Sequence, residues 1–249
     1  MTTNMGDLMA AYKKFILGQY LDYVQKYEST EKTNLDGAKF EAACYTILRA
    51  RGLRVEIGDT GTTGGADFIC SGVSCRFVVE ATTINTLVME DKTGMKHDQT
   101  GIPGGWYRAY PTLYQKLIDK AKQVAKYDIP RMGVIGSFHN ESLSLFRHVM
   151  ADKYFSVFFS RDSSGRPLPQ DSLKNISAFT LVAFGHDRYR AMGFLNPFPS
   201  YYLPIQFLPD LWFRQITQKG LEDGTLLGEW ISTNSKGQQS FEYPFEMVL

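Results

Sequence analysis

Asp67 and Glu80 are the residues of this chain whose type and spacing most clearly suggest chemistry. Asp67 lies in GGADFIC and Glu80 in RFVVEATT, and the short turn-rich stretch SGVS separates the two apolar runs. Such an arrangement is typical of two neighbouring strands, so the carboxylates are expected side by side. Two ionised acids in a half-buried place repel each other and lose hydration unless a cation or a proton compensates. Oxygen donors of this kind suit a hard divalent ion, above all Mg²⁺.

A structural role for the pair is the alternative. In that case Asp67 is an acid that caps the turn before its strand, and Glu80 forms an ion pair with Arg76 or another basic residue. Both arrangements are common in proteins, and the pair alone does not distinguish them. Alternation along the strand places Glu80 and Thr82 on one face, so that the apolar residues between them can pack on the other.

Hydrophobic periodicity places these acids in an α/β framework. Helical spacing predicts helices at 8–27, 36–52, 111–127 and 141–155. Short apolar runs predict strands at 53–57, 66–70, 75–84, 132–138 and 176–185. Three antiparallel strands, a crossover helix and a parallel strand form a mixed sheet with helices on its faces. The segment 85–110 has glycines and mixed charges, so it is predicted to be a long loop, either functional or disordered.

The composition excludes several classes of protein. The 249 residues carry a formal charge of +1, so any basic surface for nucleic acid must be local. Three cysteines without CxxC spacing argue against a disulfide framework and a structural zinc site. Neither an HExxH nor a GxSxG motif is present. The start lacks a signal-peptide pattern and no run is long enough to span a membrane, so a soluble cytoplasmic protein is expected.

The order of the motifs resembles the PD-(D/E)XK nuclease superfamily, which has the restriction-endonuclease-like fold. The similarity lies in GAKFEAACYTIL, GGADF, FVVEAT, KLIDKAKQ and RMGVIGSF over about residues 36–139, and continues through ISAFTLV and LNPFPSYYLP to about Pro204. It implies a core at about 36–204 with a central mixed sheet flanked by helices. A single domain, 1–249, would then add an N-terminal helix at about 5–30 and a C-terminal extension at about 205–249.

The resemblance implies a metal site at the acidic pair. Asp67 and Glu80 would ligate Mg²⁺ or Mn²⁺ with the backbone carbonyl of Ala81 nearby, and Glu41 would hold a metal-bound water or a second ion. The chemistry of the family is metal-dependent hydrolysis of phosphodiester bonds, so the chain is expected to be an endonuclease that acts on DNA more readily than RNA. The alternative is a catalytically inactive module that keeps the nuclease fold and binds nucleic acid or protein.

The chain departs from the family at Thr82, where the family has a lysine. A threonine hydroxyl can contact a phosphate or a metal-bound water, but it supplies no positive charge. The predicted helix at 111–127 offers replacements, because Lys116, Lys120 and Gln123 share one face. Lys120 and Gln123 are the preferred pair. A solvated helix face is the alternative for these lysines.

Weaker substrate contacts are predicted in two glycine-rich segments. Thr62 and Thr63 lie in GDTGTTGGAD, which lacks the P-loop lysine pattern but could touch a phosphate. Arg108 lies in GIPGGWYRAYP, whose aromatic residues suit either stacking on bases or packing as a plug on the core. The aromatic segment 198–213 is typical of a core or a subunit interface, and an interface would make the protein a homodimer.

Overall fold

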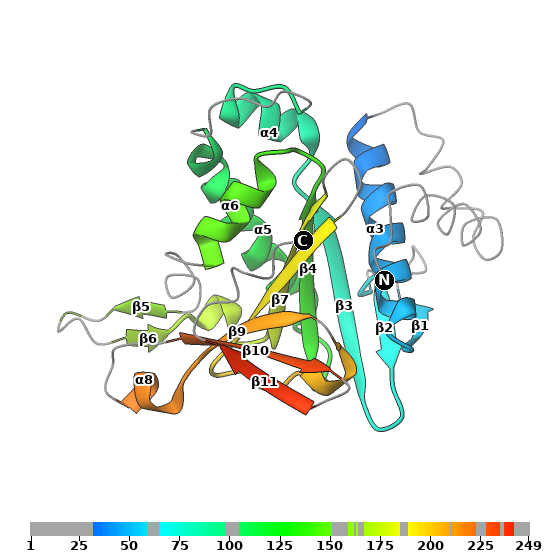
Figure 1. Cartoon of the computed structure of the whole chain (residues 1–249), viewed down its shortest axis with the longest axis vertical. Coiled ribbons are helices and arrows are strands. Elements are labelled where there is room, and N and C mark those ends of the chain that lie inside the picture. Colours follow the sequence, from blue (N-terminus) through cyan, green and yellow to red (C-terminus); the bar gives the residue numbers. More distant parts are fainter. Residues whose placement is uncertain are drawn as a thin grey trace.

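A mixed nine-stranded sheet forms the centre of the part of the protein that the structure describes (Figure 1). The computed structural model describes residues 32–58, 65–97, 105–150, 159–161, 163, 167–184, 189–209, 211–222, 228–234 and 237–241. The predicted N-terminal helix at about 5–30 lies outside these residues, as do Thr62 and Thr63. The strands of the sheet, in spatial order, are β1 (Arg54–Ile57), β2 (Phe68–Ser71), β3 (Arg76–Thr83), β4 (Arg131–Ser137), β7 (Ala178–Phe184), β8 (Tyr189–Leu195), β9 (Trp212–Ile216), β10 (Gly228–Asn234) and β11 (Gly237–Phe241).

The strand directions follow from the connections. β1, β2 and β3 form an antiparallel meander, whereas β3 pairs in parallel with β4, and β4 with β7. The outer strands alternate, with β8 antiparallel to β7 and parallel to β9, and with β10 antiparallel to both β9 and β11. The other elements are α3 (Lys32–Ala50), α4 (Thr86–Thr93), η1 (Trp106–Ala109), α5 (Tyr110–Gln123), α6 (Ser142–His148), η3 (Asp171–Leu173), η4 (Ile205–Phe207), α8 (Gln218–Glu222) and a separate hairpin of β5 (Phe159–Arg161) and β6 (Pro167–Pro169). The predicted α/β class, a mixed sheet flanked by helices, is confirmed.

Helices cover both faces of the sheet and divide the core into two layers. α3 packs on one face, where Phe40 lies with Phe77 and Val79 of β3, and α5 and α6 pack on the other (Figure 1). Val78 of β3 joins the second layer together with Leu113 of α5. Successive side chains of β3 therefore pack alternately into the two layers of the core.

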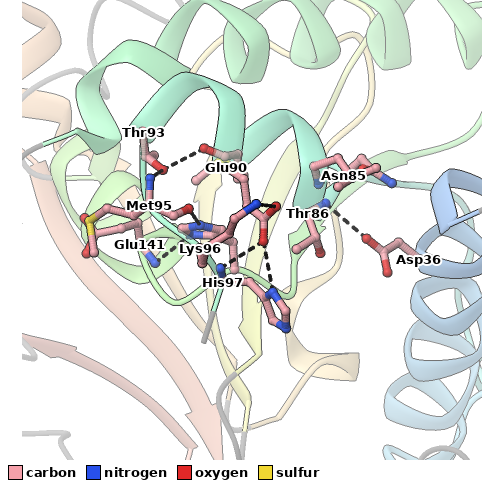
Figure 2. Close-up of polar contacts among 12 residues, drawn as sticks. Asp36, Asn85, Thr86, Glu90, Thr93, Met95, Lys96, His97 and Glu141 are labelled. Carbon is pink, nitrogen blue, oxygen red and sulfur yellow. Dashed lines mark hydrogen bonds and ion pairs between the residues drawn. The ribbon is translucent and has the colours of Figure 1, made fainter. Parts of the chain in front are cut away.

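The segment after β3, predicted to be a loop, contains α4. The side chain of Asn85 accepts the N–H of Leu87 at 2.9 Å and caps the start of this helix. Gly94, with φ of 74°, ends it in the left-handed conformation that glycine adopts without strain. Figure 2 shows that Asp36 of α3 faces the first residue of α4, and its Oδ2 accepts the N–H of Thr86 at 3.0 Å. The helix predicted to begin at Asp36 begins at Lys32 instead, and the Asp36 side chain binds the start of α4.

The chain after α4 turns back along the helix and is held by Glu90 (Figure 2). Glu90 accepts the main-chain N–H of His97 at 3.1 Å and contacts its Nδ1 at 3.0 Å, and Lys96 lies 3.4 Å from the other carboxylate oxygen. The side-chain hydrogen bond with His97 is the largest cause that lowers the pKa of Glu90 to about 2. Buried His139, after β4, contacts the carbonyl of Met95 at 3.0 Å through its Nε2. These contacts fix residues 94–97 beside the carboxyl end of β4.

The predicted C-terminal extension at about 205–249 contributes β9, β10 and β11 to the same sheet. Within the described ranges no helix is long and apolar enough to cross a membrane.

Close approach of α3 to β4 requires a glycine at position 136. A Cβ added to Gly136 would lie 2.0 Å from a ring carbon of Phe40, which is fully buried. We expect Gly136→Ala to lower the free energy of unfolding by about 1–3 kcal/mol, because the ring must shift within a packed layer. Gly37→Ala is the control, because no heavy atom lies within 4 Å of its added Cβ. That variant should gain up to about 1 kcal/mol from helix propensity. Urea unfolding followed by circular dichroism measures both, and equal stability of the two variants would contradict the packing argument.

Candidate functional site

Asp67 and Glu80 lie next to each other where the β2–β3 ladder ends. The ladder runs as far as Phe68 opposite Val79, so Asp67 and Glu80 are the next pair in register. The N–H of Asp67 donates to Glu80 Oε2 at 3.2 Å, and the N–H of Ala81 donates to Asp67 Oδ2 at 2.7 Å. Each carboxylate therefore accepts a main-chain donor at the point where regular strand pairing stops.

Burial opposes ionisation of both acids. The pKa of Asp67 is raised well above its usual value, first by burial and then by the charges of Glu80 and Glu41. The side chain of Glu80 is only 2% exposed, and burial raises its pKa as well. Lys120 acts against this effect on Glu80. The site thus contains an acid, Asp67, whose ionisation is disfavoured, beside a carboxylate that is paired with an ammonium group.

Helix α5 supplies two lysines to β3. Lys120 Nζ lies 2.8 Å from Glu80 Oε1 and 3.0 Å from Gln123 Oε1. Lys116 Nζ lies 3.5 Å from Thr82 Oγ1. Burial is the main cause that lowers the pKa of Lys116, and the neighbouring charge of Lys120 adds to it. These two lysines therefore face the strand instead of forming a solvated surface.

The spacing of the contacts has a simple geometric origin. Four residues of an α-helix rise about 6 Å, and two residues of a strand span about 6.6 Å. A helix packed antiparallel to a strand can therefore match Lys120 to Glu80 and Lys116 to Thr82. The crossover between parallel strands β3 and β4 gives α5 this direction, because the helix must return along the sheet.

One feature of the alternative interpretation, in which the acidic pair has a structural role, is present. Glu80 is paired with a basic residue, as that interpretation expected, but its partner is Lys120 and not Arg76. Asp67 does not simply cap a turn, because its carboxylate reaches across to the amide of Ala81. The contacts among these residues hold the acids and the lysine in one cluster.

Glu41 approaches the cluster from α3. It is buried, with 8% of its surface exposed, and its charge adds to the effect of burial that raises the pKa of Asp67 and of Cys44. Among the residues that the structure describes, no group of three or more His, Cys, Asp or Glu side chains is arranged as a metal site. Glu41 is therefore an electrostatic neighbour of the pair and not part of a ready three-carboxylate group in this structure.

Ala81 presents its backbone to the same side of β3 as Asp67. The N–H and C=O groups of one strand residue point toward the same neighbouring strand. Because the N–H of Ala81 donates to Asp67, its carbonyl is directed toward that side too. The predicted position of this carbonyl near the acidic pair agrees with the strand geometry.

The segment around Arg108 was predicted either to stack on bases or to pack as a plug on the core. Some of its residues are packed on the core and others are exposed. In η1, Trp106 packs toward the core and its ring lies 4.5 Å from that of His148, while Ala109 is fully buried. Tyr107 is 53% exposed, and the exposed Arg108 places its guanidinium 5.7 Å from the Tyr107 ring centroid. Trp106 and Ala109 form the plug, and Tyr107 and Arg108 remain available for contacts.

Tyr127 belongs to the site although nothing in the sequence indicated it. Its hydroxyl accepts the N–H of Ala66 at 2.8 Å, directly before Asp67. The two residues are 61 positions apart, so neither periodicity nor a local motif could reveal the contact.

Comparison of the chain with models of known protein families, with curated proteins and with solved structures found no match. A function for the chain must therefore be inferred from the geometry and chemistry of the site.

Replacing Asp67 by asparagine should stabilise the protein. The asparagine amide would keep an acceptor for the Ala81 N–H and remove the carboxylate that burial, Glu80 and Glu41 disfavour. We expect Asp67→Asn to raise the free energy of unfolding at neutral pH by about 1 kcal/mol, as is common when a functional group under electrostatic strain is removed. Urea unfolding of both proteins at neutral pH measures the difference.

The advantage of this variant should grow with pH. Because folding raises the pKa of Asp67, the folded protein keeps a proton that the unfolded chain has released. The stability of the wild type therefore falls as the pH rises from the unfolded pKa through the folded one, and asparagine removes this loss. Asp171→Asn is the control, because the Asp171 side chain is 95% exposed and its replacement should change stability little. A constant difference between Asp67→Asn and wild type from about pH 4 to about pH 8 would contradict this account.

Proposed function

We propose that the protein is a divalent-metal-dependent nuclease with a restriction-endonuclease-like core, which hydrolyses phosphodiester bonds in DNA more readily than in RNA. The observation that carries the proposal is the adjacent Asp67–Glu80 pair with Lys120 and Lys116 directed at the same strand. The order of α3, the β1–β3 meander, α5 and β4 also agrees with the motif order from which the resemblance arises.

The donor set suits Mg²⁺ or Mn²⁺. Carboxylate oxygens of Asp67 and Glu80, together with the carbonyl of Ala81, are hard ligands, and a cation would offset the burial that raises both carboxyl pKa values and the charge of Glu80 that adds to it at Asp67. Glu41 would hold a water molecule at the edge of this set. When bound, such an ion activates water and neutralises charge on phosphate oxygens.

The lysines of α5 supply the charge that Thr82 lacks. The ammonium of Lys116 lies beside the Thr82 hydroxyl, and therefore at the strand position where the family has its lysine. Lys120, held between Glu80 and Gln123, provides a second ammonium at the cluster. Both groups would bind and orient the scissile phosphate and stabilise the negative charge that develops on it.

Tyr107 and Arg108 extend the substrate surface beyond the cluster. They lie in η1, which directly precedes α5, and Lys116 lies about 9 Å along the axis of α5 from the first residue of that helix, Tyr110. An exposed tyrosine beside an arginine suits stacking on a base and pairing with a phosphate. Contacts at this distance would involve nucleotides that flank the cleaved bond.

The decisive test is loss of both metal binding and cleavage in the acid variants. We expect Asp67→Asn and Glu80→Gln to weaken Mn²⁺ binding in calorimetry at least tenfold and to lower cleavage of duplex DNA by at least about a hundredfold, because each removes a charged ligand. Asp171→Asn should leave both unchanged. Unchanged Mn²⁺ affinity in the acid variants would reject the site. A wild type that binds Mn²⁺ and DNA but never cleaves would favour the alternative, an inactive nucleic-acid-binding module.

Lys120 and a divalent ion should compete for Glu80. Lys120→Met removes the ammonium 2.8 Å from Glu80, so we expect tighter Mn²⁺ binding together with a fall in cleavage of about a hundredfold. Lys122→Met on the exposed side of the same helix is the matched control and should change neither quantity. Isothermal calorimetry and single-turnover cleavage separate the two effects. Lys120→Met with wild-type cleavage would remove Lys120 from the proposed mechanism.

A further inference from the structure

The β2–β3 ladder stops one hydrogen-bonded pair earlier than its register allows. Phe68 lies opposite Val79, so a continued ladder would place Ala66 opposite Ala81. Residues in such a pair exchange both N–H···O bonds. Here, the N–H of Ala81 donates to Asp67 Oδ2 at 2.7 Å and the N–H of Ala66 donates to the hydroxyl of Tyr127 at 2.8 Å. Both main-chain donors of the missing pair are thus bound by side chains.

Tyr127 is itself held in place from two directions. It ends the turn that follows α5, where its N–H donates to the carbonyl of Val124 at 3.2 Å. Its own carbonyl accepts Nε of Arg131 at 2.6 Å and also contacts Nη2 of that side chain. Arg131 is buried and begins β4. The hydroxyl therefore extends from a point that is fixed to both α5 and the sheet.

We propose that Tyr127 is a positioning residue for the acidic pair, an inference that rests on the proposed function of that site. Its hydroxyl draws the Ala66 N–H away from the Ala81 carbonyl and holds the strands open at Asp67. Ala66 is fully buried, and a buried N–H requires a partner. Without the hydroxyl, the N–H of Ala66 turns to the Ala81 carbonyl and the strand pair closes over the place that a metal ion would use, or this N–H loses its partner.

The arrangement also explains how one element aligns the whole cluster. Lys116 and Lys120 lie on α5, and Tyr127 lies in the turn directly after it. The same segment therefore sets the ammonium groups relative to β3 and the backbone beside Asp67 relative to β2. Loss of a hydrogen bond that orients a metal ligand typically lowers metal affinity by about tenfold to a hundredfold.

Tyr127→Phe tests the inference, with Tyr114→Phe as a matched control. Tyr114 lies on α5 and its hydroxyl donates to Gln170 Oε1 at 2.6 Å, so both variants lose one hydroxyl hydrogen bond. Each should unfold at a slightly lower urea concentration than the wild type, because each loses one hydrogen bond. We expect Tyr127→Phe alone to change hydrogen exchange at the Ala66 and Ala81 amides, and to weaken Mn²⁺ binding at least tenfold. Nuclear magnetic resonance resolves the exchange, and calorimetry measures the affinity.

The two measurements separate this inference from the proposed function. Unchanged exchange at both amides, or a Mn²⁺ affinity equal to that of Tyr114→Phe, overturns the role of Tyr127. A wild type that binds no Mn²⁺ rejects the metal site, and the exchange data then decide alone whether Tyr127 holds the ladder open. Changed exchange at Ala66, slower if the strand pair closes and faster if the N–H loses its partner, together with weaker Mn²⁺ binding in a variant as stable as the control, supports the inference.

Discussion

Burial of two adjacent carboxylates at the end of one strand pair governs the organisation of the site. Asp67 and Glu80 cannot both ionise in their buried position without compensation, and the surrounding groups provide it in two ways. Main-chain N–H groups of Asp67 and Ala81 bind the carboxylates, and Lys120 forms an ion pair with Glu80. A purely structural site would more simply replace both acids by apolar residues of similar size, which often stabilises a protein. This cost in stability is one reason why we propose a cation-binding role for the pair.

The geometry of a helix against a strand explains how positive charge reaches Thr82 without a lysine on β3. One helical turn and two strand residues cover nearly the same distance, so a lysine on α5 can reach the position of one on β3. Lys116 beside Thr82 and Lys120 beside Glu80 are consecutive contacts of this kind. A lysine on the strand is placed by its own backbone, whereas a lysine on the helix depends on how the helix packs.

Local patterns predicted much of this arrangement. Alternation in β3 and the short SGVS turn were sufficient to place Asp67 beside Glu80, and helical periodicity placed Lys120 and Gln123 on one face. Helix α4 was missed because its signals are a single capping asparagine and a terminal glycine, within a segment whose glycines and charges resemble a loop. The strands β8 to β11 were not predicted, although β7–β8 and β10–β11 pair as local hairpins, because the aromatic-rich tail lacks a clear strand pattern. The contact of Tyr127 with Ala66 was missed for another reason, because it joins residues 61 positions apart.

The positions of Lys116 and Lys120 depend on how α5 packs. The stability of one core layer is therefore linked to the chemistry of the site. Leu113, Leu117 and Ala121 are fully buried against the sheet and fix the height of α5 over β3. A displacement of the helix by a fraction of a turn would move both ammonium groups away from the strand together, and it would also pull Tyr127 from Ala66. In a protein with its lysine on the strand, the same displacement would leave the charge at the acids unchanged. Here the apolar face of α5 therefore contributes to the electrostatics of the cluster as directly as the lysines do, because it determines whether their charge reaches the carboxylates.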